Sequence, residues 1–119
     1  MSDTHVIGQI EKKLGLSLKK VSIAEIEKAD HYPEKAYAVD EENNVTGLWI
    51  DGYTVSLISE ISELIQLSAL NLRYSFFEKI HYLHKLINLN SLNLSGTKIT
   101  DVSGLKELKG LNSLVLSDT

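Results

Sequence analysis

Apolar residues recur with a period of 22 from residue 45 to the end of the chain. The copies begin at Val45, Leu67, Leu89 and Leu111, and in each copy the third and fifth residues beyond the first are also apolar. This alternation of apolar and intervening positions is typical of a strand with one buried face. A strict period of this length predicts a solenoid, in which no copy can bury its apolar face alone.

The second half of each copy carries apolar residues at every third position, as at Ile99, Val102, Leu105 and Leu108. That spacing predicts a tight helical or 3₁₀-like return rather than a long α-helix. Strands of successive copies must then lie parallel, about 4.8 Å apart. We expect these strands at 47–51, 69–73, 91–95 and 113–117. The predicted fold is α/β, a right-handed solenoid with a parallel sheet on its concave face and short helical or 3₁₀ returns.

The first 44 residues follow a different pattern. Apolar residues at helical spacing predict a helix over residues 3–14, with Ser2 or Asp3 as N-cap and Gly15 as its end. A short apolar link follows. Ser22 and Glu25, at the spacing of a capping box, then predict the start of a second helix, which should end before Pro33. We expect residues 1–36 to cover the first rung of the solenoid, since an uncovered terminal repeat would expose its leucines.

A hairpin is expected between this cover and the first copy. Residues 37–40 read as a short strand, and Glu41, Glu42, Asn43 and Asn44 read as a turn. An antiparallel strand should therefore flank the first rung. We expect two domains, a cap over 1–44 and the 22-residue repeats over 45–119, with three full copies and the strand of a fourth.

Composition and charge exclude several kinds of partner and cellular setting. The net charge of −4 and the pI near 5.5 argue against a nucleic-acid or anionic-membrane surface. No apolar run approaches the roughly 18 residues of a membrane span, and the amino terminus does not read as a secretory signal. The chain has no cysteine, so there is no disulfide or thiolate chemistry. These features favour the cytoplasm.

The segment LNSLNLSGTKITDVSGLKELKG, residues 89–110, resembles the 22-residue leucine-rich repeat of internalin-like and phosphatase-regulator-type proteins. The register matches over residues 45–119. The cap, with Tyr37-x-Val39-Asp40 and the residues after it, resembles the amino-terminal caps of bacterial leucine-rich arrays, including those of Roco-type GTPases. Two departures stand out. Tyr53 occupies a position where the family carries Asn, Cys or Thr, and no closing helix follows the last strand.

The resemblance implies a binding scaffold, whose surface the repeat register locates. Residues flanking the strand leucines should point onto the concave sheet in three columns. The first column is small throughout: Gly47, Ala69, Ser91 and Ser113. The candidate partner-binding residues are Trp49, Asp51, Asn71, Arg73, Asn93, Ser95 and Val115, flanked by Tyr53 and Tyr74.

Trp49 is the first of these candidates, because tryptophan, tyrosine and arginine are enriched at binding hot spots. Trp49, Tyr53, Arg73 and Tyr74 should lie close together, and the small neighbouring column leaves room for a partner. The alternative is that Trp49 packs against the cover or against Arg73. Asp51 and Arg73 are expected to pair across adjacent rungs, and the two asparagines either bond each other or contact a ligand.

Motifs for catalysis or cofactor binding are absent from the sequence. Glu78, His81 and His84 are three residues apart and could share one side of a helical turn as metal ligands. Exposed polar residues between core positions are the better account of them. No nucleophile elbow or phosphate-binding loop occurs. We expect no enzyme activity, no cofactor and no metal site.

The predicted function is that of a protein-interaction scaffold, the amino-terminal part of a longer leucine-rich array that binds a protein on its concave face. Four strands span only about 15 Å, which is small for a standard interface of about 800 Å² per partner. One alternative is a recognition or regulatory domain of a Roco-type GTPase or another multidomain effector. A second is an enzyme with its site in the cap. The last rung has a neighbour on one side only, which predicts either self-association through that rung or a frayed carboxyl terminus.

Overall fold

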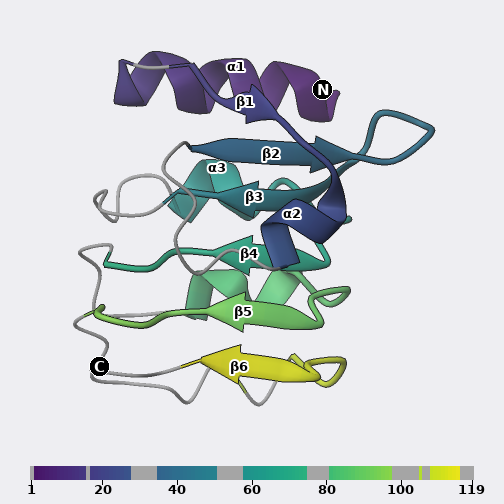
Figure 1. The fold of residues 1–119 in the computed structure, drawn as a ribbon, viewed down its shortest axis with the longest axis vertical. Coiled ribbons are helices and arrows are strands. Elements are labelled where there is room, and N and C mark those ends of the chain that lie inside the picture. Colours follow the sequence, from purple (N-terminus) through teal and green to yellow (C-terminus); the bar gives the residue numbers. More distant parts are fainter. Residues whose placement is uncertain are drawn as a thin grey trace.

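The structure, a computed structural model, describes residues 2–15, 17–27, 35–50, 58–74, 81–97, 105 and 108–115. One sheet runs through this part of the chain with its strands in sequence order (Figure 1). The strands are β1 (Lys19–Lys20), β2 (Ala36–Val39), β3 (Val45–Trp49), β4 (Ala69–Asn71), β5 (Ser91–Asn93) and β6 (Ser113–Val115). Only β2 and β3 pair antiparallel, and the other neighbours pair parallel. The fold is therefore mixed α/β with a mainly parallel sheet.

The register of the parallel strands follows the sequence period. Leu48 pairs with Leu70, Leu70 with Leu92 and Leu92 with Leu114, a step of 22 residues each time. Strands β4, β5 and β6 are shorter than expected, but the parallel hydrogen bonding continues beyond β3 and β4. The Ile50 N–H donates to the Asn71 carbonyl at 2.9 Å, and Leu72 N–H donates to the Asn93 carbonyl at 2.9 Å. Each copy therefore contains a strand that overlaps its predicted range, although β3 spans Val45–Trp49 rather than 47–51.

The returns repeat as regularly as the strands. They include α3 (Ile58–Ile61) and the 3₁₀ helix η2 (His81–Lys85). Three equivalent hydrogen bonds close a tight turn in successive copies: Leu64 N–H to Ile61 O, Leu86 N–H to Leu83 O and Leu108 N–H to Leu105 O, at 2.9–3.0 Å. These bonds between residues three apart explain the apolar spacing of three in the sequence.

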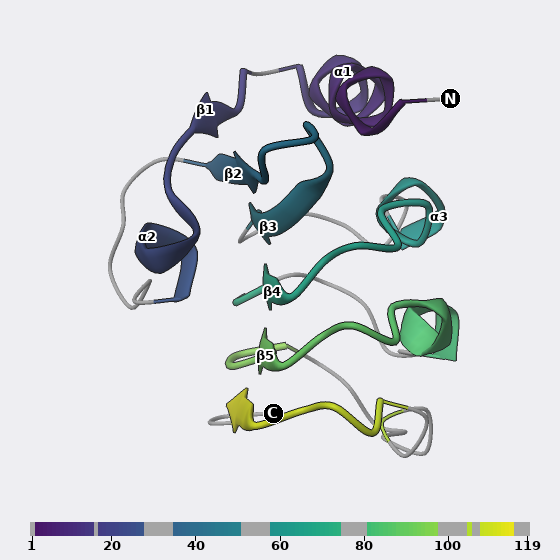
Figure 2. The ribbon, with the colours of Figure 1, turned by 90° about the vertical axis from the view of Figure 1, so that its right-hand side faces the viewer.

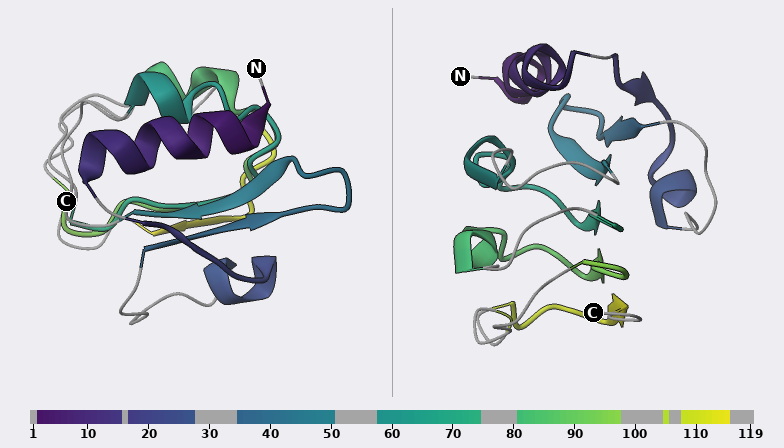
Figure 3. Two further views of the ribbon diagram at one scale, coloured as in Figure 1. Left: turned by 90° about the horizontal axis from the view of Figure 1, so that it is seen from above. Right: turned by 90° about the vertical axis from the view of Figure 1, so that its left-hand side faces the viewer.

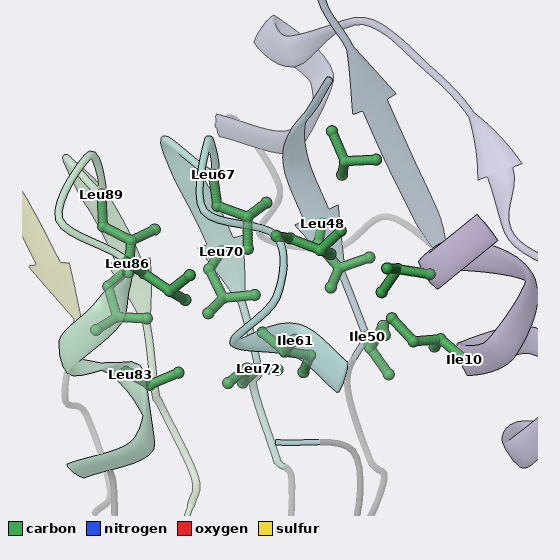
Figure 4. Close-up of a cluster of buried hydrophobic side chains, with 14 of the residues drawn as sticks. Ile10, Leu48, Ile50, Ile61, Leu67, Leu70, Leu72, Leu83, Leu86 and Leu89 are labelled. Carbon is green, nitrogen blue, oxygen red and sulfur yellow. The ribbon is translucent and has the colours of Figure 1, made fainter. Parts of the chain in front are cut away.

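The main core lies between the sheet and the returns. Figure 4 shows side chains from both layers meeting there, with Leu70 and Leu72 from the β4 segment facing Ile61 of α3. The fully buried members include Leu48, Ile50, Ile61, Leu64, Leu67, Leu83, Leu86, Leu89 and Leu94. Stacked copies thus share one continuous core, as expected for repeats that cannot bury their apolar faces singly.

The first helix, α1 (Asp3–Leu14), closes the amino-terminal end of this core. The Ser2 side chain accepts from the His5 N–H, and Gly15 ends the helix at φ +68°. The carboxylate of Asp3, the first residue of α1, accepts the buried Val45 N–H at 2.9 Å, and Lys13 pairs with Glu60 of α3. The prediction of a helix over 3–14 is confirmed.

The second helix, α2 (Ile23–Glu27), lies on the opposite face of the sheet from the returns. Figure 2 shows the sheet edge-on, with α1 and the returns along one side and α2 on the other. Figure 3 gives the same order of layers from above. The predicted capping box forms, because Glu25 N–H donates to Ser22 Oγ at 3.3 Å and Ser22 N–H donates to Glu25 Oε1 at 3.4 Å. The residues expected to cover only the first rung are therefore divided between the end of the core and the face of the sheet.

Strand β1 was not expected from the sequence. Lys19 and Lys20 extend beside β2, where Lys19 N–H donates to Lys35 O and Val21 N–H donates to Tyr37 O. Both lysines are exposed, so their side chains gave no strand pattern. Exposed lysines on an edge strand oppose pairing with another chain.

The expected hairpin joins β2 to β3. Its turn is held by Asp40, whose carboxylate accepts the N–H groups of Glu42 and Asn44, each at 2.9 Å. The hydrogen bond from the Asn44 backbone is the largest influence on the pKa of Asp40, which is lowered. Asn43 adopts a φ of 65°, which asparagine tolerates in turns.

No helix in the described ranges has the length and apolar character needed to cross a membrane.

Candidate binding face of the sheet

The face of the sheet on which α2 lies carries the residues between the core leucines, and we call it the α2 face. On β2 it presents Ala36 and Ala38, and on β3 it presents Gly47 and Trp49. By register, Ala69 and Asn71 follow on β4, and Ser91 and Asn93 on β5. This is the surface that the sequence predicted for a partner.

Trp49 is buried on this face, with 1% of its surface exposed. It packs with Ile26 of α2 and with Ala36 and Ala69. The expectation that its ring is presented to a partner is wrong in this arrangement, and the alternative, packing against the cover, holds. The sequence showed which side of the strand Trp49 faces but not that α2 would lie over it.

The small residues of the first column also differ from the expectation. An ideal Cβ on Gly47 would lie 2.7 Å from Ile23 Cδ1 and 3.1 Å from Ile26 Cγ1. Ala69 is 2% exposed. The room that these residues leave is therefore filled by α2 over β3 and β4, and the column is partly open at Ser91 and exposed at Ser113.

Arg73 lies at the border of the covered area. Its guanidinium carbon is 5.8 Å from the centroid of the Trp49 ring and 5.4 Å from that of Tyr74. Both distances are within the range of a cation–π contact. The predicted cluster of Trp49, Arg73 and Tyr74 is confirmed, whereas Tyr53 and Asp51, with the ion pair expected between Asp51 and Arg73, lie outside the described residues.

Asn71 and Asn93 make the same contact one copy apart. The Asn71 Oδ1 accepts the Arg73 N–H at 3.1 Å, and the Asn93 Oδ1 accepts the Ser95 N–H at 3.0 Å. Each asparagine thus binds the backbone of its own rung, which orients the residue two positions later. Asn71 is buried and Asn93 half-buried, so Asn71 supports the sheet rather than offering its amide to a partner.

Two further candidates, Ser95 and Val115, lie within the described residues. Ser95 is 9% exposed, which leaves little of its surface for a partner. Val115 lies in β6 and pairs with Asn93. The accessible part of the α2 face is therefore formed by half-buried Arg73, Ser91 and Asn93 with exposed Ser113, and Tyr74, 54% exposed, stands at its edge.

The sequence reading missed Ile23 and Ile26 as contacts of this face. A signal was present, because a capping box is followed by two branched apolar residues three positions apart, which describes a short amphipathic helix. What the pattern could not supply was the surface against which that helix packs.

No metal centre is found in the described part of the chain, where no three His, Cys, Asp or Glu side chains come together. Glu78 lies outside that part. His84 is exposed in η2, and only the backbone of His81 is described.

No protein-family model matches the sequence. No match to a curated protein was found either. Among solved structures, a plant ice-binding protein superposes over 97% of this chain and 39% of its own, at 21% identity and a TM-score of 0.68. A likeness at that identity concerns the fold alone.

Two internalins of Listeria monocytogenes match smaller parts. Internalin C2 covers 50% of this chain at 28% identity with a TM-score of 0.48, and the internalin inlF covers 66% at 25% identity with a TM-score of 0.42. The chain spans 26% and 25% of these two proteins.

Proposed function

We propose that the chain is a leucine-rich-repeat scaffold that binds a protein on the α2 face of its sheet. The observation that carries this proposal is the position of Arg73. Its guanidinium lies against Trp49 and Tyr74, at the border between the part of the face under α2 and the accessible part. Tryptophan, tyrosine and arginine are each enriched at binding hot spots.

The repeat architecture is supported by equivalences in each layer of the molecule. The strands pair with a step of 22 residues, and the returns close with equivalent hydrogen bonds. Thr97, at the position where the family carries Asn, Cys or Thr, is buried and donates its hydroxyl to the Leu94 carbonyl at 2.7 Å. These features support a right-handed solenoid with a concave sheet, and residues 1–44 as its amino-terminal cap.

The chemistry of the accessible area supports a protein ligand. It combines one cation with an exposed ring and small polar side chains, Ser91, Asn93 and Ser113. Small side chains let a partner approach the sheet, while arginine supplies several directed donors.

The proposal can be tested with partners captured from cells of the source organism. The chain is immobilised beside two charge-reversal variants, Arg73→Glu on the α2 face and Lys109→Glu at an exposed turn outside it. Tyr74→Ala is the third variant. A partner retained by wild type and by Lys109→Glu, but lost by Arg73→Glu and Tyr74→Ala, supports the proposal.

A purified partner then allows the contribution of Arg73 to be measured by calorimetry. Loss of a hot-spot residue costs about 2 kcal/mol or more, roughly a 30-fold loss of affinity. Equal binding by the wild type and both α2-face variants would rule out this face as the site, provided that their circular dichroism spectra are unchanged.

A further inference from the structure

Helix α2 is a short amphipathic segment with one apolar side on the sheet. Ile26 is buried and Ile23 half-buried, while Ala24 and Glu25 between them are exposed. Both isoleucines reach the position of Gly47, where an ideal Cβ would fall 2.7 Å from Ile23 Cδ1 and 3.3 Å from Ile26 Cβ. The helix therefore packs two branched side chains, three residues apart, against the sheet at Gly47, which has no side chain.

The cluster beneath α2 is separate from the main core. Ile26, Ala36, Ala38, Trp49 and Ala69 form it, with Val21 and Ile23 at its edge. The leucines of the repeats pack on the other side of the sheet with α1. The residues that pack between the sheet and the returns include none from α2.

We propose that α2 is the built-in occupant of a helix-docking surface, and that a partner helix with branched apolar residues three positions apart takes its place. This inference rests on the proposed protein-binding function and specifies the partner. The occupant is identified by what the structure already holds there: a helix, with isoleucines at Ile23 and Ile26, packed beside the Trp49 ring.

The shape of the surface explains why a helix fits it. Gly47, Ala36, Ala38 and Ala69 keep the middle of the face low, so that a helix backbone can approach the strands. Trp49 supplies a large apolar contact, and Arg73 stands at the border for an acidic residue of the partner. The partner helix then covers the apolar face in place of α2, while the displaced α2 exposes Ile23 and Ile26. Because the face must open before the partner binds, the apparent affinity is the intrinsic affinity reduced by the open fraction of the chain.

A disulfide can hold α2 in place. The chain has no cysteine, and the Cβ of a residue at position 47 would lie 3.3 Å from Ile26 Cβ. This is close to the 3.5–4.5 Å between Cβ atoms in disulfides. The double variant Ile26→Cys/Gly47→Cys should therefore form a bond that locks the helix, and the same protein after reduction is its matched control.

A second variant is designed to release α2 from the face, and we call it the vacated variant. The double variant Ile23→Ser/Ile26→Ser removes the two apolar contacts of α2 and leaves the repeats unchanged. Trp49 is the single tryptophan of the chain, so its emission reports on this face alone. We expect the emission to shift to longer wavelength in the vacated variant, while the circular dichroism of the sheet is retained.

The probe is a synthetic peptide of residues 17–27, which carries α2 and the strand before it. Added to the vacated variant, it should return the Trp49 emission toward the wild-type wavelength in a saturable titration. A control peptide with serine in place of both isoleucines should have no effect. The oxidised cysteine variant should bind the peptide at least about tenfold more weakly than the reduced form, because its open fraction is removed.

Three results would overturn the inference. One is a vacated variant that loses its fold, since α2 would then be an indispensable part of the core. The second is a vacated, folded variant whose Trp49 emission does not respond to the peptide. The third is equal peptide binding by the oxidised and reduced forms.

The peptide experiment does not depend on a cellular partner. If the peptide binds but no captured protein depends on Arg73, the proposed function fails while the docking surface stands. If a captured partner binds the oxidised and reduced forms equally, the face binds proteins without displacement of α2, and the inference fails alone.

Discussion

The ring of Tyr74 lies over Gly96, the residue at the same place one copy later. An ideal Cβ on Gly96 would fall 2.2 Å from Cδ1 and 2.4 Å from Cε1 of Tyr74. Both residues have a positive φ, 59° for Tyr74 and 70° for Gly96, so the same turn ends two successive strands. The glycine makes room for the ring, and the ring in turn contacts Arg73 at the border of the α2 face.

Gly96→Ala should therefore destabilise the chain and move the Tyr74 ring. An alanine in the left-handed region costs about 1–2 kcal/mol, and its methyl group would overlap the ring. Chemical denaturation measures the loss, and the chemical shifts of the Tyr74 ring report its displacement.

The double variant Tyr74→Ala/Gly96→Ala separates the two causes. With the ring removed, only the backbone cost at position 96 should remain, so the two substitutions should be non-additive. Strictly additive losses would mean that the ring yields without cost.

Leu92→Ala and Leu94→Ala should each cost about 2–5 kcal/mol, as for other buried leucines. Leu92 is 1% exposed and Leu94 fully buried in the core between sheet and returns. The matched control is Ile87→Ala, because Ile87 is 67% exposed and its loss should fall within about 0.5 kcal/mol. Denaturant melts of the three variants give the comparison, and a loss below that of Ile87→Ala would exclude either leucine from the core.

Asp3→Ala should weaken the attachment of α1 to the first repeat strand. The Asp3 carboxylate accepts the N–H of Val45, which is completely buried. Leaving a buried N–H without its acceptor costs about 1–3 kcal/mol. Asp3→Asn keeps an acceptor oxygen in place and should cost less, and amide exchange at Val45 should rise in the alanine variant alone.

The contact between Lys13 and Glu60 should make stability depend on pH. Burial raises the pKa of Glu60, but the hydrogen bonds from Lys13 and Ser59 outweigh it and leave the pKa below its ordinary value of 4.5. A lowered pKa adds stability above pH 4.5, and this stability is lost as the pH falls through the folded-state pKa.

Lys13→Met should reduce that dependence. Because Lys13 is 51% exposed, the difference from wild type at neutral pH should stay below about 1 kcal/mol. It should shrink further as the pH falls below 4.5, which melts over the acidic range can follow. A difference that grows on acidification would mean that Glu60 is not stabilised by Lys13.

The amino-acid pattern was enough to predict the parts of the fold that repeat or that depend on neighbouring residues. Identical spacing in successive copies fixed which residues face the core, because a strand alternates its sides and a tight turn repeats every third residue. Local hydrogen bonding fixed the ends of α1 and the capping box of Ser22 and Glu25. The nearness of Trp49, Arg73 and Tyr74 followed from the register alone.

The segment that covers the outer face of the sheet could not be predicted from the pattern. The apolar pattern of residues 21–26 shows that α2 needs a surface, but the main core and the α2 face could both have received it. The choice depends on the fit between Ile23, Ile26 and the low surface at Gly47, which involves segments separated by more than twenty residues. For the same reason the sequence could place Trp49 on the correct side of β3 and still not show that it is buried. The direction of a side chain is set by its own strand, whereas its burial is set by whichever distant segment packs against it.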